Sequence, residues 1–132
     1  MRSDGRGLGA VFLGGSAGAL ARVWLSDALT HHPGSWPWST LVINVAGTLL
    51  LGALAGRRLT GRSIGFAQQP LLEVGFCGAL TTFSTFQLEL LQMLDDGRAG
   101  LAAAYVAVSI AAGLGALALT GPHRAITRDP SA

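Results

Sequence analysis

The residues best suited to chemistry gather in one stretch, from Gly75 to Glu89, which reads GFCGALTTFSTFQLE. Its polar side chains are hydroxyls, one amide and one carboxylate, at Thr81, Thr82, Ser84, Thr85, Gln87 and Glu89. Hydroxyls and amides can donate hydrogen bonds without carrying a charge, which suits the binding of a small ion. No nucleophile stands at a useful spacing from a base, so we predict that the protein is not an enzyme.

This stretch lies within an apolar segment bounded by Pro70 and Asp95, whose length fits a bilayer span of about 20 residues. Gly78, Thr81 and Thr82 are poor helix formers at the midpoint of that span. We therefore predict that the helix is broken near Gly78 to Thr82. Hydrocarbon cannot satisfy the backbone groups that a break frees, so another chain, water or an ion must pair with them.

The composition indicates a membrane protein, because half of the 132 residues are hydrophobic and only 12% are charged. Four apolar runs predict an all-α protein with a single four-span domain. We place the spans at about 7–25, 39–56, 70–94 and 99–119, followed by a disordered tail at 123–132. The first run continues past Arg22, so we expect a retained span and not a cleaved signal peptide. A lone Cys77 excludes an intramolecular disulfide, and no Cys/His cluster predicts a zinc site.

Two other spans carry polar side chains at intervals of four residues, which places them on one helical face. These stripes consist of Thr40, Asn44 and Thr48 in the second span, and of Tyr105, Ser109 and Gly113 in the fourth. A buried asparagine needs partners for both ends of its amide. Asn44 must therefore face either a neighbouring helix or a ligand, and the sequence leaves both open.

The first span contains small residues and one arginine. Gly14 and Gly18 have the spacing that lets two helices approach closely, either inside one bundle or between subunits. Arg22 lies near the far end of the span. It either extends to the lipid headgroups or supplies positive potential to an anion in a wet vestibule.

A file of neutral donors suits a small, strongly hydrated anion, because it can replace water without trapping the ion. Phe83 and Phe86 lie three residues apart among these donors. The edge of an aromatic ring is partly positive, so rings presented edge-on could coordinate an anion. Filling a core is the commoner use of such a pair, and only the surrounding hydroxyls favour the functional interpretation.

The string GFCGALTTFSTF, from Gly75 to Phe86, closely resembles the signature of the CrcB/Fluc fluoride channels. The segment VINVAGTLLLG, which contains Asn44 and Gly47, is similar to the second-helix motif of that family, and the likeness extends over all four spans. The resemblance implies an antiparallel dimer that exports cytoplasmic fluoride through two pores. It also implies one structural sodium ion (Na+) on the two-fold axis, held by main-chain carbonyls of the helix break.

The resemblance also implies roles for individual residues. Those of the fluoride pore would be Asn44, Phe83, Ser84, Thr85, Phe86, Tyr105 and Ser109. Gly78 and Thr81 would supply the sodium-binding carbonyls. Arg22 would lie near the pore entrance and Glu89 near a vestibule. Ala79 departs from the family pattern, which usually has a second glycine there, but a methyl group is a small change.

Arginine is distributed unequally between the two sides of the predicted spans. Seven arginines fall on one side, at positions 2, 6, 57, 58, 62, 124 and 128, and Arg98 is alone in the loops of the other. This bias predicts a multi-pass protein of the cell membrane with one fixed orientation and both termini in the cytoplasm. An antiparallel dimer would then need a second, homologous chain of opposite orientation. The competing possibility is a homodimer that tolerates the bias.

Other functions fit the sequence less well. A small multidrug-type exporter of lipophilic cations would need a carboxylate in the first span, and none is present there. A non-conducting partner subunit of a heterodimeric fluoride channel would explain the small-residue stripes, but not the Phe83 and Phe86 pair among hydroxyls. Nucleic-acid binding is not predicted, because the arginines that give the net charge of +2 lie at the ends of apolar runs, as membrane topology requires.

Overall fold

The computed structural model describes residues 5–29, 35–62, 65 and 68–120, and this part of the chain is helical with no strand. Its elements are α1 (Gly5–Ala28), α2 (Trp38–Leu59), the π-helix η1 (Pro70–Cys77), α3 (Gly78–Leu80), α4 (Phe83–Asp95) and α5 (Ala99–Thr120). Helices α1, α2 and α5 are long and apolar enough to cross a membrane. The prediction of an all-α membrane protein is therefore confirmed. The predicted tail at 123–132 and the arginines at positions 2, 124 and 128 lie outside the described residues.

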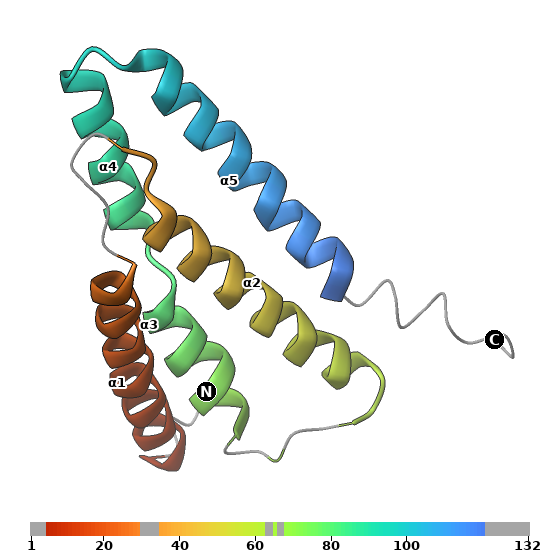
Figure 1. Ribbon diagram of the computed structural model, residues 1–132. Helices are drawn as coiled ribbons and strands as arrows, with labels where there is room; N and C mark the ends of the chain where they lie inside the picture. Colours follow the sequence, from red (N-terminus) through yellow and green to blue (C-terminus); the bar gives the residue numbers. More distant parts are fainter. Residues whose placement is uncertain (1–4, 30–34, 63–64, 66–67, 121–132) are drawn as a thin grey trace, which may run out of the picture.

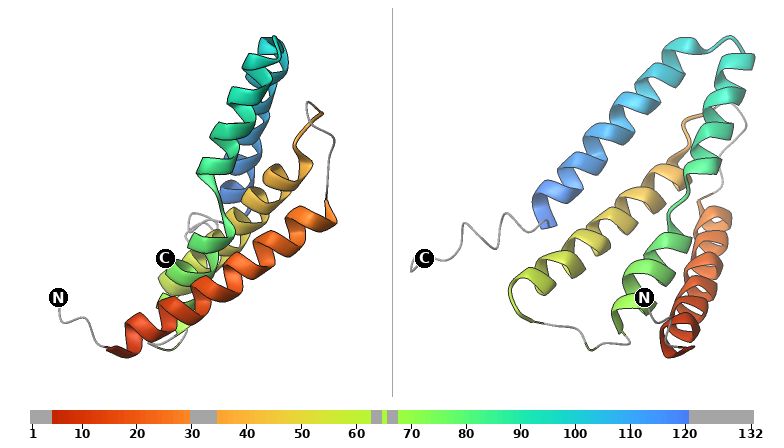
Figure 2. Two further views of the ribbon diagram at one scale, coloured as in Figure 1. Left: turned by 90° about the vertical axis from the view of Figure 1, so that its left-hand side faces the viewer. Right: turned by 180° about the vertical axis from the view of Figure 1, so that it is seen from behind.

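The helices pack in two neighbouring groups (Figure 1). Helix α1 lies along η1 and α3, and α2 lies along α5. Helices α4 and α5 form a hairpin, and the views of Figure 2 show α4 beside the N-terminal part of α5. The hairpin turn contains Gly97 at a φ of 73°, a conformation that favours glycine, and the Arg98 N–H donates to the Met93 carbonyl at 2.8 Å.

Glycines bring α1 and η1 into backbone contact. A Cβ atom on Gly14 would overlap the carbonyl of Leu71, and one on Gly18 would overlap the carbonyl of Phe76. From the opposite side, a Cβ atom on Gly75 would lie 2.7 Å from the carbonyl oxygen of Val11. Of the two uses left open for the pair Gly14 and Gly18, the structure has the packing inside one chain. This contact fixes the first half of the 70–95 segment against α1.

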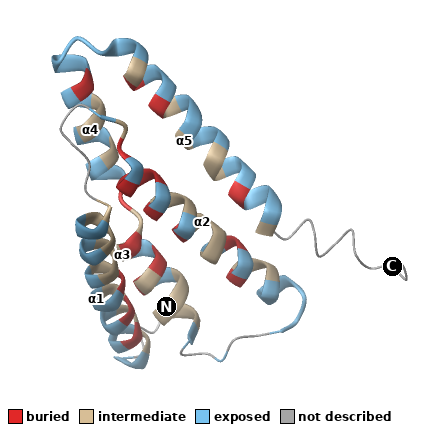
Figure 3. Ribbon diagram, viewed as in Figure 1, coloured by how far each residue is buried: buried red, intermediate tan, exposed pale blue. Residues whose placement is uncertain are grey.

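Burial is confined to the inward faces of the helices, as Figure 3 shows. A core cluster of Leu41, Met93, Ala102 and Tyr105 joins α2, α4 and α5. Many large apolar side chains on the outer faces are exposed, including Phe12, Trp24, Ile110 and Leu114. An exposed apolar surface of this extent is typical of a protein covered by lipid or by another subunit.

The helical path is interrupted between α3 and α4. Thr81 (φ −74°, ψ 148°) and Thr82 (φ −142°, ψ 120°) are both extended. Helix α4 then begins with Thr82 as its N-cap, whose hydroxyl oxygen accepts from the Thr85 N–H at 3.2 Å. As a result, none of the three helices between Pro70 and Asp95 has the length of a span by itself.

Candidate functional site

Asn44 of α2 pairs with the backbone of the extended segment. Its Nδ2 donates to the carbonyl oxygen of Thr82 at 3.2 Å, and the Thr82 N–H donates to its Oδ1 at 2.9 Å. Both ends of the amide are therefore engaged, and both backbone groups of Thr82 are satisfied. The side chain of Asn44 replaces hydrogen bonds that the missing helical turn would have made.

Two carbonyls at the interruption have lost their helical donors. In an unbroken helix the Thr82 N–H would donate to Gly78, and the Thr85 N–H would donate to Thr81. These N–H groups go instead to Asn44 Oδ1 and to Thr82 Oγ1. The carbonyl oxygens of Gly78 and Thr81 therefore lack these two donors, and unwound backbone carbonyls can coordinate Na+ in broken membrane helices.

Hydroxyl groups surround the start of α4. Thr82 Oγ1 donates to Thr85 Oγ1 at 3.0 Å and lies 3.3 Å from Ser84 Oγ. Thr81 Oγ1 instead donates back to the Cys77 carbonyl at 3.0 Å. Ser84 and Thr85 are both exposed in the single chain. The hydroxyl cluster therefore faces outward, next to the extended segment.

Two cavities meet at α2. The larger, here called the break cavity, has a volume of about 360 Å³ and lies between α2, η1 and the extended segment. The smaller, here called the phenylalanine cavity, has a volume of about 220 Å³ and lies between α2, α4 and α5. Asn44, Thr48 and Phe83 line both. The three residues therefore mark the place where the two spaces adjoin.

The phenylalanine cavity holds a hydroxyl without a partner. Ser109 Oγ is buried and forms no hydrogen bond with any described residue. Phe83 and Phe86 line the same cavity, with ring centroids 6.0 Å apart and planes inclined by 24°. Leaving a buried polar group unpaired costs about 1–3 kcal/mol, so a bound ion or water would find a donor there. No charged side chain is among the described residues that line this cavity.

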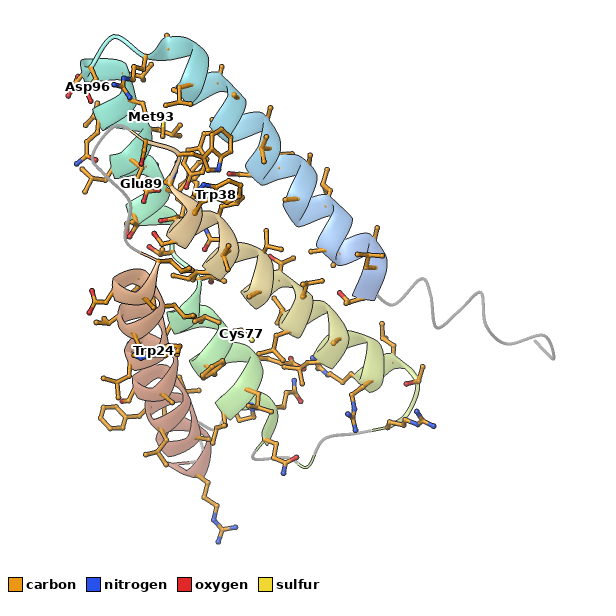
Figure 4. All side chains as sticks on the ribbon, viewed as in Figure 1. Trp24, Trp38, Cys77, Glu89, Met93 and Asp96 are labelled. Carbon is orange, nitrogen blue, oxygen red and sulfur yellow. The ribbon has the colours of Figure 1, made fainter. Side chains whose placement is uncertain are left out.

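Glu89, labelled on α4 in Figure 4, accepts two hydrogen bonds from neutral hydroxyls on other helices. Thr40 Oγ1 on α2 lies 2.7 Å from its Oε1, and Tyr105 OH on α5 lies 2.8 Å from its Oε2. Tyr105 is fully buried, and the centroids of its ring and the Phe86 ring are 4.9 Å apart. The carboxylate thus joins α2, α4 and α5 beside the phenylalanine cavity.

Comparison with known proteins identifies the family. A family model described as CrcB-like protein, Camphor Resistance (CrcB), matches residues 9–121. The chain belongs to the CrcB family. It is 50% identical over 111 residues to the fluoride-specific ion channel FluC 1 of Mycolicibacterium paratuberculosis, and the match covers 84% of each chain.

More distant members of the CrcB family carry similar names. The fluoride-specific ion channel FluC 2 of Symbiobacterium thermophilum is 44% identical over 108 residues, covering 81% of this chain and 88% of that one. The fluoride-specific ion channel FluC of Azotobacter vinelandii is 41% identical over 109 residues, covering 80% and 86%. These relatives are named as ion channels, which agrees with the prediction that the chain is not an enzyme.

The predicted site residues of this CrcB chain fall into separate groups. Around the two cavities lie Asn44, Gly78, Thr81, Phe83, Phe86 and Ser109. Ser84 and Thr85 belong to the hydroxyl cluster, and Tyr105 is bonded to Glu89. Arg22 is half-buried on α1, lines neither cavity, and forms no side-chain hydrogen bond or ion pair with the described residues.

Sequence reasoning left several polar residues of this region out of the predicted site, among them Thr40, Thr48 and Glu73. Thr40 and Thr48 stood in the polar stripe of the second span, and their spacing from Asn44 was the available signal. The structure bonds Thr40 to Glu89 and places Thr48 on both cavities. Glu73, which lines the break cavity, gave no comparable signal because an acidic residue in a first helical turn is commonplace.

Proposed function

We propose that this chain is a subunit of a fluoride-selective channel that exports fluoride from the cytoplasm. The observation that carries the proposal is the unpaired, buried hydroxyl of Ser109 in a cavity shared with Phe83 and Phe86. It is supported by 50% identity to a relative named a fluoride-specific ion channel. A neutral donor beside ring edges can replace part of the water shell of a small anion without holding the ion by a full charge.

In this proposal the 70–95 segment crosses the membrane as a broken third span, and two antiparallel subunits form two pores. Gly78 and Thr81 direct their freed carbonyls to a sodium ion on the dimer axis. When bound, that ion neutralises the negative ends of carbonyl dipoles that hydrocarbon would leave unpaired. Asn44 supports the same arrangement, because it holds the Thr82 N–H away from the Gly78 carbonyl.

The arginine bias leads us to propose a fixed orientation, with the N- and C-termini in the cytoplasm. The working dimer then pairs this chain with an oppositely oriented homologue, and relatives named FluC 1 and FluC 2 are compatible with paired subunits. A homodimer that tolerates the bias is the competing assembly. A C-terminal tag accessible from one side only supports the heterodimer, and equal labelling from both sides supports the homodimer.

Fluoride efflux from loaded liposomes tests the channel proposal. We expect rapid efflux of fluoride that is not seen when chloride takes its place in the liposomes. This efflux should occur either with the purified chain alone or after co-purification with a homologue of opposite orientation. Efflux without a partner identifies a homodimer. Cation-coupled drug exchange would instead indicate an exporter. Absence of fluoride flux in both preparations would identify a non-conducting subunit and contradict the proposal.

Phe83→Ile is the sharpest variant for this assay. Phe83 is 70% exposed in the single chain, so its replacement leaves the fold of the subunit intact, whereas loss of the ring edge removes an anion contact. We expect fluoride flux to fall at least tenfold with assembly unchanged. Phe12→Ile is the matched control, since Phe12 is 72% exposed on α1 and lines neither cavity. Equal flux from the two variants would mean that Phe83 serves only packing.

A further inference from the structure

Arg58, in the last turn of α2, faces two side chains at the start of η1, those of Glu73 and of the N-cap residue Gln69. Its Nη1 lies 3.2 Å from Oε2 of Glu73. The Gln69 amide also faces this guanidinium; because a guanidinium can only donate, we assign the amide oxygen to that side, 3.0 Å from both Nη1 and Nη2. Arg57 precedes it on the same turn and makes no side-chain ion pair with the described residues. Arg58 is therefore the arginine of this turn that joins α2 to η1.

The pairing of Glu73 is incomplete. Its side chain is 11% exposed, and Oε1 is buried without a hydrogen-bond partner among the described residues. Burying a carboxylate whose lone pairs are only partly satisfied is unfavourable. A neutral glutamine could join α2 to η1 through the same hydrogen bonds at a lower desolvation cost. A purely mechanical role therefore does not account for the charge at this position.

The charge of Glu73 acts on the break cavity, which adjoins the phenylalanine cavity at Asn44, Thr48 and Phe83. Glu73 lines the break cavity together with Gly78, Thr81 and Phe83. Among the described residues that line either cavity, Glu73 is the only one with a charged side chain. In a space otherwise walled by neutral groups, one carboxylate dominates the local potential, and the neighbouring guanidinium offsets it.

We propose that the Arg58–Glu73 pair sets the electrostatic potential at the arginine-bearing end of the break cavity, and thereby the rate at which fluoride enters from that side. The proposal rests on the channel function given above. Glu73 opposes the approach of an anion, and Arg58 cancels that opposition while it stays paired. Neither residue touches the ion. They act on the ion through the electrostatic potential alone, and the two charges have effects of opposite sign.

The test compares Glu73→Gln, Arg58→Gln and the double variant in the liposome flux assay. Glu73→Gln should raise fluoride flux and Arg58→Gln should lower it, each about two- to 17-fold, the range for one charge acting over roughly 10 Å at an effective dielectric constant between about 20 and 80. The double variant should return near the wild-type flux. Both single effects should shrink in 1 M salt, where the Debye length falls to about 3 Å.

A mechanical clamp gives a different pattern. If both single variants lower flux, or neither changes it, the electrostatic proposal is wrong. Arg57→Gln is the control, because it removes the same charge from the same turn without touching Glu73. Equal losses of flux from Arg57→Gln and Arg58→Gln would mean that the effect comes from the general surface potential. That result would contradict the proposed role of the Arg58–Glu73 pair. Wild-type protein that conducts in the same assay separates each of these results from failure of the channel function itself.

Discussion

The double hydrogen bond between Asn44 and Thr82 is the contact on which the interruption between α3 and α4 depends most. Replacing Asn44 with leucine keeps the branched shape and the number of heavy atoms of the side chain and removes both partners of the Thr82 backbone. The Thr82 N–H and carbonyl would then lie in a 7%-exposed residue without the bonds they make at 2.9 and 3.2 Å. We expect Asn44→Leu to destabilise the subunit and to disturb the geometry of the extended segment.

The size of the effect follows from these two groups. Each buried backbone group left unpaired costs about 1–3 kcal/mol, which gives an upper range of roughly 2–6 kcal/mol. Asn44 and Thr82 both line the break cavity of about 360 Å³, and a water molecule occupies about 30 Å³, so water can recover part of the loss. The expected decrease in the free energy of unfolding is therefore about 2–4 kcal/mol.

Unfolding by SDS titration of the purified protein in mixed micelles measures this difference directly. Thr48→Val is the matched control, because Thr48 lies one turn further on the same face and its hydroxyl donates only to the Asn44 carbonyl of its own helix, at 2.8 Å. That variant should lose no more than about 1 kcal/mol. If the two variants agree within about 0.5 kcal/mol, the asparagine does not hold the extended segment and the reasoning fails.

Two further substitutions test the packing and the carboxylate. Gly14→Ala should lower the free energy of unfolding by about 1–3 kcal/mol in the same titration, because the new methyl group overlaps the Leu71 carbonyl. Gly9→Ala is the control and should be neutral or stabilising, since nothing lies within 4 Å of the new atom. Equal losses from the two variants would contradict the contact between α1 and η1. Tyr105→Phe should cost about 1.5–3 kcal/mol, since Glu89 loses a charge-assisted hydrogen bond while the ring stays in place. An unchanged midpoint for that variant would mean that the bond contributes nothing.

The positions of the long helices could be predicted because apolar runs and their ends are local features of the sequence. The expected spans 7–25, 39–56 and 99–119 fall within Gly5–Ala28, Trp38–Leu59 and Ala99–Thr120. The π-helix at Pro70–Cys77 could not be anticipated. The backbone of this π-helix packs closely against Gly14 and Gly18 of α1. Such contacts between segments distant in sequence override the local helix propensity.

The partners of the polar side chains were beyond the sequence for a related reason. Spacing placed Asn44 on one face of its helix, but only the crossing of α2 with the extended segment decides that both ends of its amide meet Thr82. In the same way, 15 residues separate Arg58 from Glu73, and 16 separate Glu89 from Tyr105. Such pairs depend on where helices meet in space, which helical periodicity alone does not determine.

The hydroxyl hydrogens available to an anion are fewer than the number of hydroxyls in the sequence suggests. Each hydroxyl has one hydrogen, and those of Thr40 and Tyr105 both go to Glu89, so these side chains present lone pairs and not donors to the cavity beside them. Ser109, whose hydroxyl has no acceptor among the described residues, is the hydroxyl donor that remains free in the phenylalanine cavity. In the proposed channel, an anion that reaches Thr40 or Tyr105 would need a hydrogen that already serves the carboxylate of Glu89. Fluoride and Glu89 would then compete for the same two hydroxyl hydrogens.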